Sequence, residues 1–359
     1  MKLTVIGHSL VHIRQRRFFA HVARLGHDVL VVCPNRWAHL DCLPSTESGP
    51  GWSYTISPLP APGQPDMYQF GLLGLAKVLT DFHPDVVYVQ EEVGARITRQ
   101  ALDLAKELGA ARTLFVWENQ QAPTPAQEEL LRQLDLLVCG NDAAAGLHSA
   151  APTWCILPQV GVDTDHFQAR NTPRDQRAIF VANEPPGTRR PEKGFDLAKR
   201  AWPTMGRLEF TPFRAMPWAY SQIQVVVCPS IDSTWWREQA MPYVAVEANS
   251  CFVPAIVSDA GSIPYWHTRF AGTNPGVKII PTGGLELREA GGKVVMASRS
   301  EAIPEGLALK MARDLADAIG ELLGDEGKRV QMGKMGRDWV MENLSNRVIA
   351  KKLVEALSG

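Results

Sequence analysis

Two acidic residues, Glu238 and Glu247, lie in a stretch that also predicts a phosphate-binding turn. They follow an apolar run, residues 225–227, that predicts a buried strand. A second apolar run, residues 255–257, leads into small residues that include Gly261 and Ser262, which indicates a turn at the start of a helix. Backbone N–H groups at such a turn can hold an anion, and the helix dipole favours negative charge there. Carboxylates that bind hydroxyl groups beside a diphosphate turn indicate a nucleotide-sugar site.

A basic loop with the sequence RRPEKG contributes cations to the same half of the chain. A run of this kind is often only a solvated loop. Here it follows a predicted strand, residues 178–182, and precedes a predicted helix, residues 195–202, so it is expected to face phosphate. Arg190 and Lys193 are therefore candidate diphosphate ligands.

Polar residues also follow three predicted strands in the first half of the chain, where the carboxyl ends of parallel strands would bring them together: His8, His12, Gln90, Glu91, Glu92, Trp117, Glu118 and Asn119. Glu91 or Glu92 could orient an acceptor hydroxyl or stabilise positive charge in a transition state; the alternative is a solvated pair of strand-end acids. Trp117 could stack on a sugar face while Glu118 and Asn119 bind its hydroxyls, or it could simply be packed in the interior.

Strands and helices alternate along the chain, which predicts an α/β fold. A helix over residues 14–25 separates strands at 3–7 and 28–33, with Gly26 as its C-terminal cap, and this is a right-handed βαβ unit. Asn141 is expected to cap the N-terminus of another helix. Residues 49–64 are rich in Gly, Pro and Ser and are expected to hold at most one short strand. Two parallel sheets in tandem would place a ligand between their carboxyl edges.

Composition narrows the functional class. The chain has 359 residues, 45% apolar and 21% charged, as expected for a globular protein of two domains. A net charge of −1 argues against a generic nucleic-acid binder. No apolar run approaches the length of a membrane span, and six scattered cysteines indicate buried thiols in a reducing compartment. A cytoplasmic location is expected.

Four motifs occur in order along the chain: RRFFAHVARLGHDVLVVCP, LPQVGVDTDHF, PEKG, and CPS followed by WWREQAMPYVAVEA and AIVSDAGSIP. Together they resemble the retaining GT-B glycosyltransferases of family four, which use nucleotide-sugar donors. The resemblance implies two tandem Rossmann-like parallel-sheet domains facing a cleft, with the acceptor on the first domain and the donor on the second. It implies no cofactor and no metal, because basic side chains and helix N-termini offset the diphosphate charge.

The resemblance also implies domain boundaries. We expect an acceptor-binding domain at 1–160, a linker at 161–177, a donor-binding domain at 178–342, and a C-terminal helix at 343–359 that packs back on the first domain. About thirty residues separate PEKG from CPS, fewer than in the family, so the second domain is expected to be shortened.

The resemblance also predicts individual residues of the donor-binding site. Glu247 matches the second of two family glutamates, expected on the ribose. Eight residues separate it from Glu238, one more than the family pattern of seven, so Glu238 is preferred for the sugar hydroxyls and Gln239 is held in reserve.

Lys193 matches the diphosphate lysine, and the turn from Gly261 through Ser262 to Ile263 matches the distal phosphate turn. Asn183 stands where the family has an arginine, and Arg190 is the closest replacement cation.

Three alternatives stay open at this point. The altered motifs could belong to a non-catalytic GT-B partner or regulatory subunit. His8 or His12 could serve as the base of an inverting or epimerase-like GT-B enzyme. The basic run before Phe18 and Phe19 could contact an anionic membrane on the cytoplasmic face. The acceptor could be a glycan, a lipid-linked sugar or a small molecule.

Overall fold

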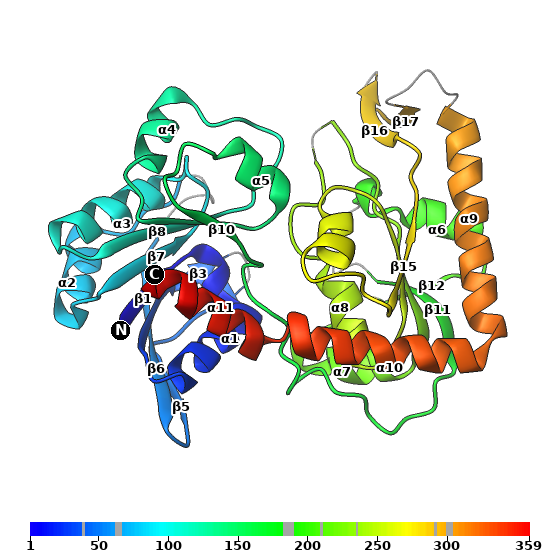
Figure 1. Cartoon of the computed structure of the whole chain (residues 1–359), viewed down its shortest axis with the longest axis horizontal. Helices are drawn as coiled ribbons and strands as arrows, with labels where there is room; N and C mark the ends of the chain where they lie inside the picture. The colour runs from blue at the N-terminus through cyan, green and yellow to red at the C-terminus, as the bar shows by residue number, and fades with distance from the viewer. Residues whose placement is uncertain are drawn as a thin grey trace. The chain divides into compact units, whose positions relative to one another are not determined.

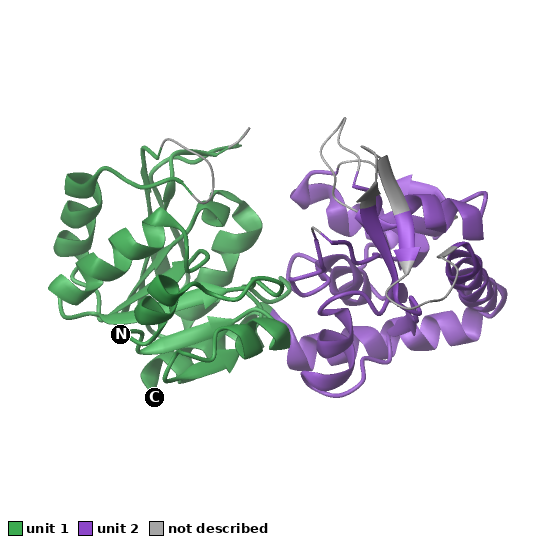
Figure 2. Cartoon of the chain, turned by 90° about the horizontal axis from the view of Figure 1, so that it is seen from above, with its two compact units in different colours: residues 1–163, 346–359 green, residues 164–345 purple. Residues whose placement is uncertain are grey.

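The computed structural model describes residues 1–37, 40–61, 67–181, 190–208, 211–234, 236–290, 293–298 and 304–359. The chain forms two compact units, Met1–Asp163 with Asn346–Gly359, and Thr164–Ser345 (Figures 1 and 2). In the described part of the chain, none of the helices combines the length and apolar character needed to cross a membrane.

Unit 1 is built on an eight-stranded sheet with the order β10-β9-β8-β7-β1-β2-β6-β5. Every neighbouring pair is parallel except β5 with β6. The strands of unit 1 are β1 (Lys2–Ile6), β2 (Asp28–Pro34), β5 (Ser45–Gly49), β6 (Trp52–Leu59), β7 (Val86–Gln90), β8 (Ala111–Val116), β9 (Leu136–Cys139), β10 (Trp154–Ile156) and the small hairpin of β3 (Arg36–Trp37) with β4 (Leu40–Asp41).

Helices cover this sheet because one face of each is apolar. The helices of unit 1 are α1 (Ile13–Arg24), α2 (Leu72–Phe82), α3 (Arg96–Glu107), α4 (Pro125–Leu131), α5 (Asp142–Leu147) and α11 (Asn346–Ser358). One core cluster packs α2 and α3 against the side chains of the central strands. The chain's last helix, α11, packs against α1 (Figure 1).

Two predicted helix caps are confirmed. Gly26, with φ of 87°, follows the end of α1, and its N–H donates to the carbonyl of Ala23. Asn141 caps α5, because its Oδ1 accepts from the N–H of Ala144 at 2.7 Å.

The structure differs from one sequence-based expectation for unit 1 and bears on the alternative of membrane contact. Residues 52–59 form a full strand of the sheet, in which Tyr54 and Ile56 are buried. Phe18 and Phe19 are also fully buried and pack edge to face, so they offer no apolar surface to a membrane. The helix that carries them is amphipathic, and its apolar side faces the sheet.

Unit 2 has a five-stranded parallel sheet with the order β12-β11-β13-β14-β15. A separate antiparallel hairpin, which the sequence did not predict, pairs β16 with β17. The strands are β11 (Gln176–Val181), β12 (Gly206–Leu208), β13 (Ile223–Cys228), β14 (Ala255–Ser258), β15 (Val277–Ile280), β16 (Leu285–Ala290) and β17 (Lys293–Ser298). The helices are α6 (Phe195–Ala201), α7 (Met216–Ser221), α8 (Tyr243–Ser250), α9 (Pro304–Gly324) and α10 (Glu326–Asn343).

Candidate functional site

Lys193 is held beside the carboxyl end of β13. It ends a single 3-10 turn, Pro191–Lys193, and Gly194 follows with φ of 79°. A Cβ on Gly194 would lie 2.0 Å from the carbonyl oxygen of Pro229, so only glycine allows this approach. The PEKG motif thereby fixes the lysine against the residues that follow β13.

Lys193 and Glu238 meet at this edge of the sheet. The lysine Nζ lies 3.0 Å from Oε2 and 3.2 Å from Oε1 of Glu238. The hydroxyl of Ser230 donates to the same Oε2 at 3.0 Å. The ring of Trp236 lies beneath the lysine, with Nζ 4.3 Å from its centroid. The neighbouring Cys228 stays a thiol, because burial raises its pKa to about 12.

The predicted phosphate turn packs directly on the backbone of Glu238. Gly261 has φ of 49°, and a Cβ there would lie 2.3 Å from the Glu238 carbonyl oxygen. The N–H of Gly261 donates to Asp232 Oδ2 at 3.2 Å, and the N–H of Ser262 donates to the Glu238 carbonyl at 2.8 Å. The sequence predicts that these amides can hold an anion, but in the structure both already donate, one to Asp232 and one to the Glu238 carbonyl. A phosphate here would have to displace Asp232.

The other predicted donor residues are placed as follows. Glu247 lies on α8, is 1% exposed, and accepts a hydrogen bond from the Tyr220 hydroxyl at 3.4 Å. Arg190 donates to Glu192 Oε1 at 2.7 Å and lies over the ring of Trp236. Their donor roles stay predictions.

Three further predicted residues complete this set. Gln239 is half-buried next to Glu238. Ile263 donates its N–H to the Ala260 carbonyl, and Asn183 lies outside the described residues.

In unit 1, His8 and Glu91 form a close pair. His8 lies in the 3-10 turn after β1, and Glu91 follows β7, the neighbouring strand. The His8 Nδ1 lies 2.7 Å from Oε1 and 2.9 Å from Oε2, and the His8 N–H donates to Oε1 at 2.6 Å. Tyr68 donates its hydroxyl to Oε1 at 2.8 Å, and burial raises the pKa of Tyr68 well above its usual value, so it stays a donor. The indole of Trp37 contacts the imidazole, with centroids 4.9 Å apart.

This geometry assigns different positions to the two candidate histidines. Glu91 holds Nδ1 of His8, which leaves Nε2 as the ring nitrogen directed away from the carboxylate, and His8 is 19% exposed. His12 is exposed at the start of α1. His8 is thus in direct contact with a strand-end acid.

Glu92 links the ends of β7 and β8 instead of joining His8. Its Oε1 accepts from the Trp117 N–H at 3.0 Å. Its Oε2 is buried and has no hydrogen-bond partner among the described residues. Burial raises the pKa of Glu92 to about 7, and the Trp117 amide opposes that shift.

The remaining predicted acceptor residues lie near these strand ends. Gln90 is fully buried, and its side chain contacts Gln159 at 3.4 Å. Glu118 accepts from the N–H groups of Gln120 and Gln121, so its carboxylate is folded back onto its own loop. Asn119 is 6% exposed, and Trp117 packs on the ring of Phe115. These roles also stay predictions.

Sequence reasoning assigned no role to several side chains of these clusters, among them Tyr68, Trp37 and Ser230. Tyr68 and Trp37 carry no motif, and they reach His8 and Glu91 only through the fold. Ser230 belongs to the quoted CPS motif, where its place directly after a buried strand was the available signal.

No protein-family model and no curated protein sequence matches this chain. Solved structures do match it over nearly its full length. Sucrose-phosphate synthase from Thermosynechococcus elongatus has 15% identity, a TM-score of 0.64, and coverage of 99% of this chain and 98% of that one. HepE from Anabaena, in complex with UDP and glucose, has 12% identity, a TM-score of 0.60, and coverage of 100% and 99%. The α,α-trehalose 6-phosphate synthase from Burkholderia multivorans has 11% identity, a TM-score of 0.59, and coverage of 99% and 98%. The predicted GT-B fold, an α/β architecture with parallel sheets, is confirmed.

Proposed function

We propose that this protein is a glycosyltransferase that moves a hexose-type sugar from a nucleoside diphosphate sugar to a hydroxyl acceptor. The observation that carries the proposal is the cluster of Lys193, Glu238 and Ser230 at the carboxyl edge of the unit 2 sheet. A lysine ammonium can bind a diphosphate, and a carboxylate can accept hydrogen bonds from sugar hydroxyls. Two of the similar structures are complexes of HepE from Anabaena, one with UDP-glucose and one with UDP.

The proposed donor site assigns one task to each group. Lys193 and Arg190 offset the diphosphate charge, and no metal is required for this. Glu238 accepts hydrogen bonds from sugar hydroxyls, and Glu247 binds the ribose once the donor rearranges its buried surroundings. The turn at Gly261 and Ser262 approaches the distal phosphate after Asp232 is displaced.

The leading mechanism retains the anomeric configuration. The acceptor hydroxyl attacks the anomeric carbon on the face that the diphosphate leaves, and the departing phosphate oxygen takes the acceptor proton. No protein base is needed in that case. The chain's contribution is then orientation of both substrates and stabilisation of the leaving diphosphate.

An inverting reaction is the second candidate, because His8 and Glu91 are paired. Glu91 would orient the imidazole and stabilise its protonated form, while Nε2 removes the proton from the acceptor hydroxyl. The new glycosidic bond would form on the face opposite the leaving diphosphate.

The test is donor-dependent transfer by the full chain with UDP, GDP, ADP and TDP sugars, after a thermal-shift screen for binding. We expect one donor to be used, with activity unchanged by EDTA. Lys193→Ala should lower donor affinity, whereas Lys310→Ala, which changes an exposed lysine on α9, should not. Binding of a donor without transfer to any acceptor would favour a non-catalytic partner. Absence of nucleotide binding would refute the donor site.

A further inference from the structure

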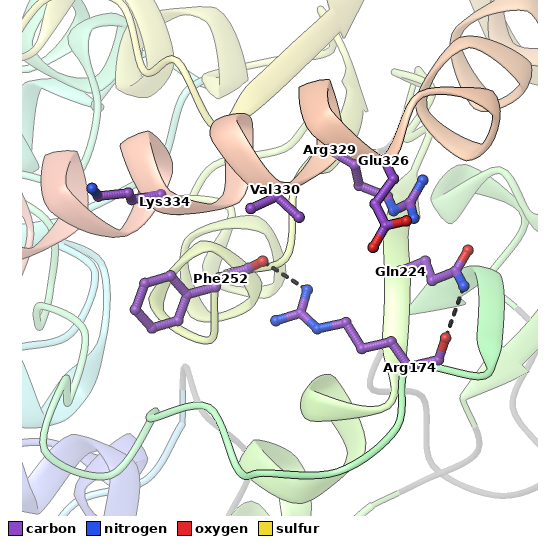
Figure 3. Close-up of a pocket in the computed structure, with 7 residues that line it drawn as sticks. All are labelled: Arg174, Gln224, Phe252, Glu326, Arg329, Val330 and Lys334. Carbon is purple, nitrogen blue, oxygen red and sulfur yellow. Dashed lines mark hydrogen bonds between the residues drawn. The ribbon is translucent and has the colours of Figure 1, made fainter.

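A cavity in unit 2 lies away from the cluster of Lys193 and Glu238. Its volume is about 600 Å³, within the range of small-molecule sites. Figure 3 shows the residues that line it. Gln224, the second residue of β13, lines it, and Arg174 lies just before β11. The Gln224 amide donates to the Arg174 carbonyl at 2.8 Å. The cavity is thus at the amino edge of these strands, whereas Lys193 and Glu238 lie at the carboxyl edge.

Arg174 presents a fixed positive charge to this cavity. Its guanidinium donates to the carbonyl of Phe252 at 2.8 Å (Figure 3). It also donates to the carbonyl of Cys251 at 3.0 Å, just after the end of α8. No acidic side chain among the described residues pairs with it. Burial lowers the pKa of Arg174, and the positive charge of Arg329 acts in the same direction. The two guanidinium groups therefore repel one another, and added negative charge in the cavity would reduce this repulsion.

Two more cations and one acid line the same cavity from α10. Arg329 donates through Nη1 to the carbonyls of Leu322 and Leu323 at the end of α9, which orients it. Lys334 and Glu326 are exposed and form no ion pair with any described residue. Three cations and one carboxylate give the lining a formal charge of +2. Val330, which is 62% exposed, and Phe252 supply apolar surface between the charges.

We propose that this cavity binds a small organic phosphate monoester, independently of the proposed transfer reaction. A phosphate monoester carries close to two negative charges at neutral pH, which matches the lining, whereas a carboxylate would leave one positive charge uncompensated. The guanidinium groups of Arg174 and Arg329 bind the phosphate oxygens, since planar guanidinium suits this geometry. Val330 and Phe252 contact the body of the ligand.

The test uses calorimetry on the full chain with glucose 6-phosphate as the probe. Glucose and gluconate are matched probes of similar size, one uncharged and one with a single carboxylate. Glucose 6-phosphate should give saturable binding, and the other two should bind at least about tenfold more weakly. No saturable binding of glucose 6-phosphate, or equal binding of gluconate, would overturn the proposal.

Variants locate the bound anion. Arg329→Gln should weaken binding about tenfold, and Lys334→Gln, at an exposed position with no described partner, about threefold. Glu326→Gln should strengthen binding about threefold, because it removes the only negative charge of the lining. Arg313→Gln, an exposed arginine of α9 outside the cavity, is the matched control and should leave binding unchanged.

Lys193→Ala separates this site from the proposed donor site. Binding of glucose 6-phosphate should survive that substitution. If Lys193→Ala abolishes binding while Lys334→Gln and Glu326→Gln leave it unchanged, the anion binds at the carboxyl edge and the proposal is wrong.

Discussion

Lys193 and Glu238 neutralise one another, with Nζ 3.0 Å from Oε2. The sequence motifs predict that the lysine binds a diphosphate and that the glutamate binds sugar hydroxyls. They do not reveal that the two side chains are paired with each other. The pair is largely shielded, since the side chains are 20% and 14% exposed, so solvent and salt screen the attraction between the two charges less than at a fully exposed ion pair. A donor that binds here must exchange this contact for two others, one to each residue.

The exchange predicts opposite effects of two substitutions on UDP binding. Lys193→Met should weaken UDP binding about tenfold, because a charge-assisted contact to phosphate is lost. Glu238→Gln should strengthen UDP binding about threefold, because the lysine is no longer held by a carboxylate. The same Glu238→Gln protein should transfer sugar more slowly, since the sugar hydroxyls lose a charged acceptor. Calorimetry with UDP and initial rates with the UDP sugar measure the two effects, and weaker UDP binding by Glu238→Gln would contradict this account.

His8 discriminates between the two reaction courses. In His8→Asn the amide can still donate to Glu91 but cannot act as a base. A retaining enzyme should keep transfer within about tenfold of the unaltered chain and give a product with the donor's anomeric configuration. Loss of about a hundredfold or more, together with an inverted product, would show that His8 is a general base. The anomer is read by proton NMR of the product before it mutarotates, and the rate by release of the nucleoside diphosphate.

Gly261 holds the Glu238 segment by close contact. In Gly261→Ala the new Cβ would lie 2.3 Å from the Glu238 carbonyl oxygen, so the segment must move. Gly272→Ala is the matched control, because Gly272 also has a positive φ, 79°, but open space around it. The control should lose about 1 kcal/mol of folding stability from backbone strain alone. Gly261→Ala should lose about 2 kcal/mol or more and also bind UDP more weakly, as followed by urea unfolding and calorimetry. Equal effects of the two substitutions on UDP binding would show that Gly261 does not position Glu238.

The parallel strands could be predicted because they are buried on both faces and read as continuous apolar runs, as at β7 and β13. β6 was expected at most as one short strand, because it lies in a stretch rich in Gly, Pro and Ser and contains Pro58, which lies near its end in register with Cys33. The alternation of apolar and polar residues over residues 52–57 was the available signal. Its serine and proline content hid a strand that is stabilised by its neighbours β2 and β5. The β16–β17 hairpin was missed as well. Its Leu287 exchanges backbone hydrogen bonds with Asp232 and Thr234, which are distant in the sequence.

The candidate site, like the fold, could be predicted only in part. Lys193 and Glu238 could each be identified from a local motif, but their contact depends on the approach of Gly194 to Pro229, which no spacing reveals. Glu91 could be named as a candidate, whereas its pairing with His8 required the adjacency of β1 and β7. Tyr68 follows a proline- and glycine-rich segment without a motif, and only the folded chain brings its hydroxyl to Glu91. Contacts between distant segments are the part that single-sequence patterns do not contain.

Glu92 should make stability depend on pH with a predictable sign. Its pKa is about 7 in the folded chain because of burial, against 4.5 for an ordinary glutamate, so the folded state binds more protons than the unfolded state between these values. The free energy of unfolding therefore contains a contribution that is complete below pH 4.5 and is lost as pH rises through 7. Glu92→Gln removes this dependence, and the stability of the variant relative to the unaltered chain should rise by on the order of 2 kcal/mol between pH 5 and pH 8. Urea unfolding at several pH values measures the difference, with Glu129→Gln, an exposed glutamate of α4, as the control that should show no such trend. A difference that does not change with pH would mean that Glu92 is ionised in the folded chain throughout, with its buried Oε2 satisfied by water.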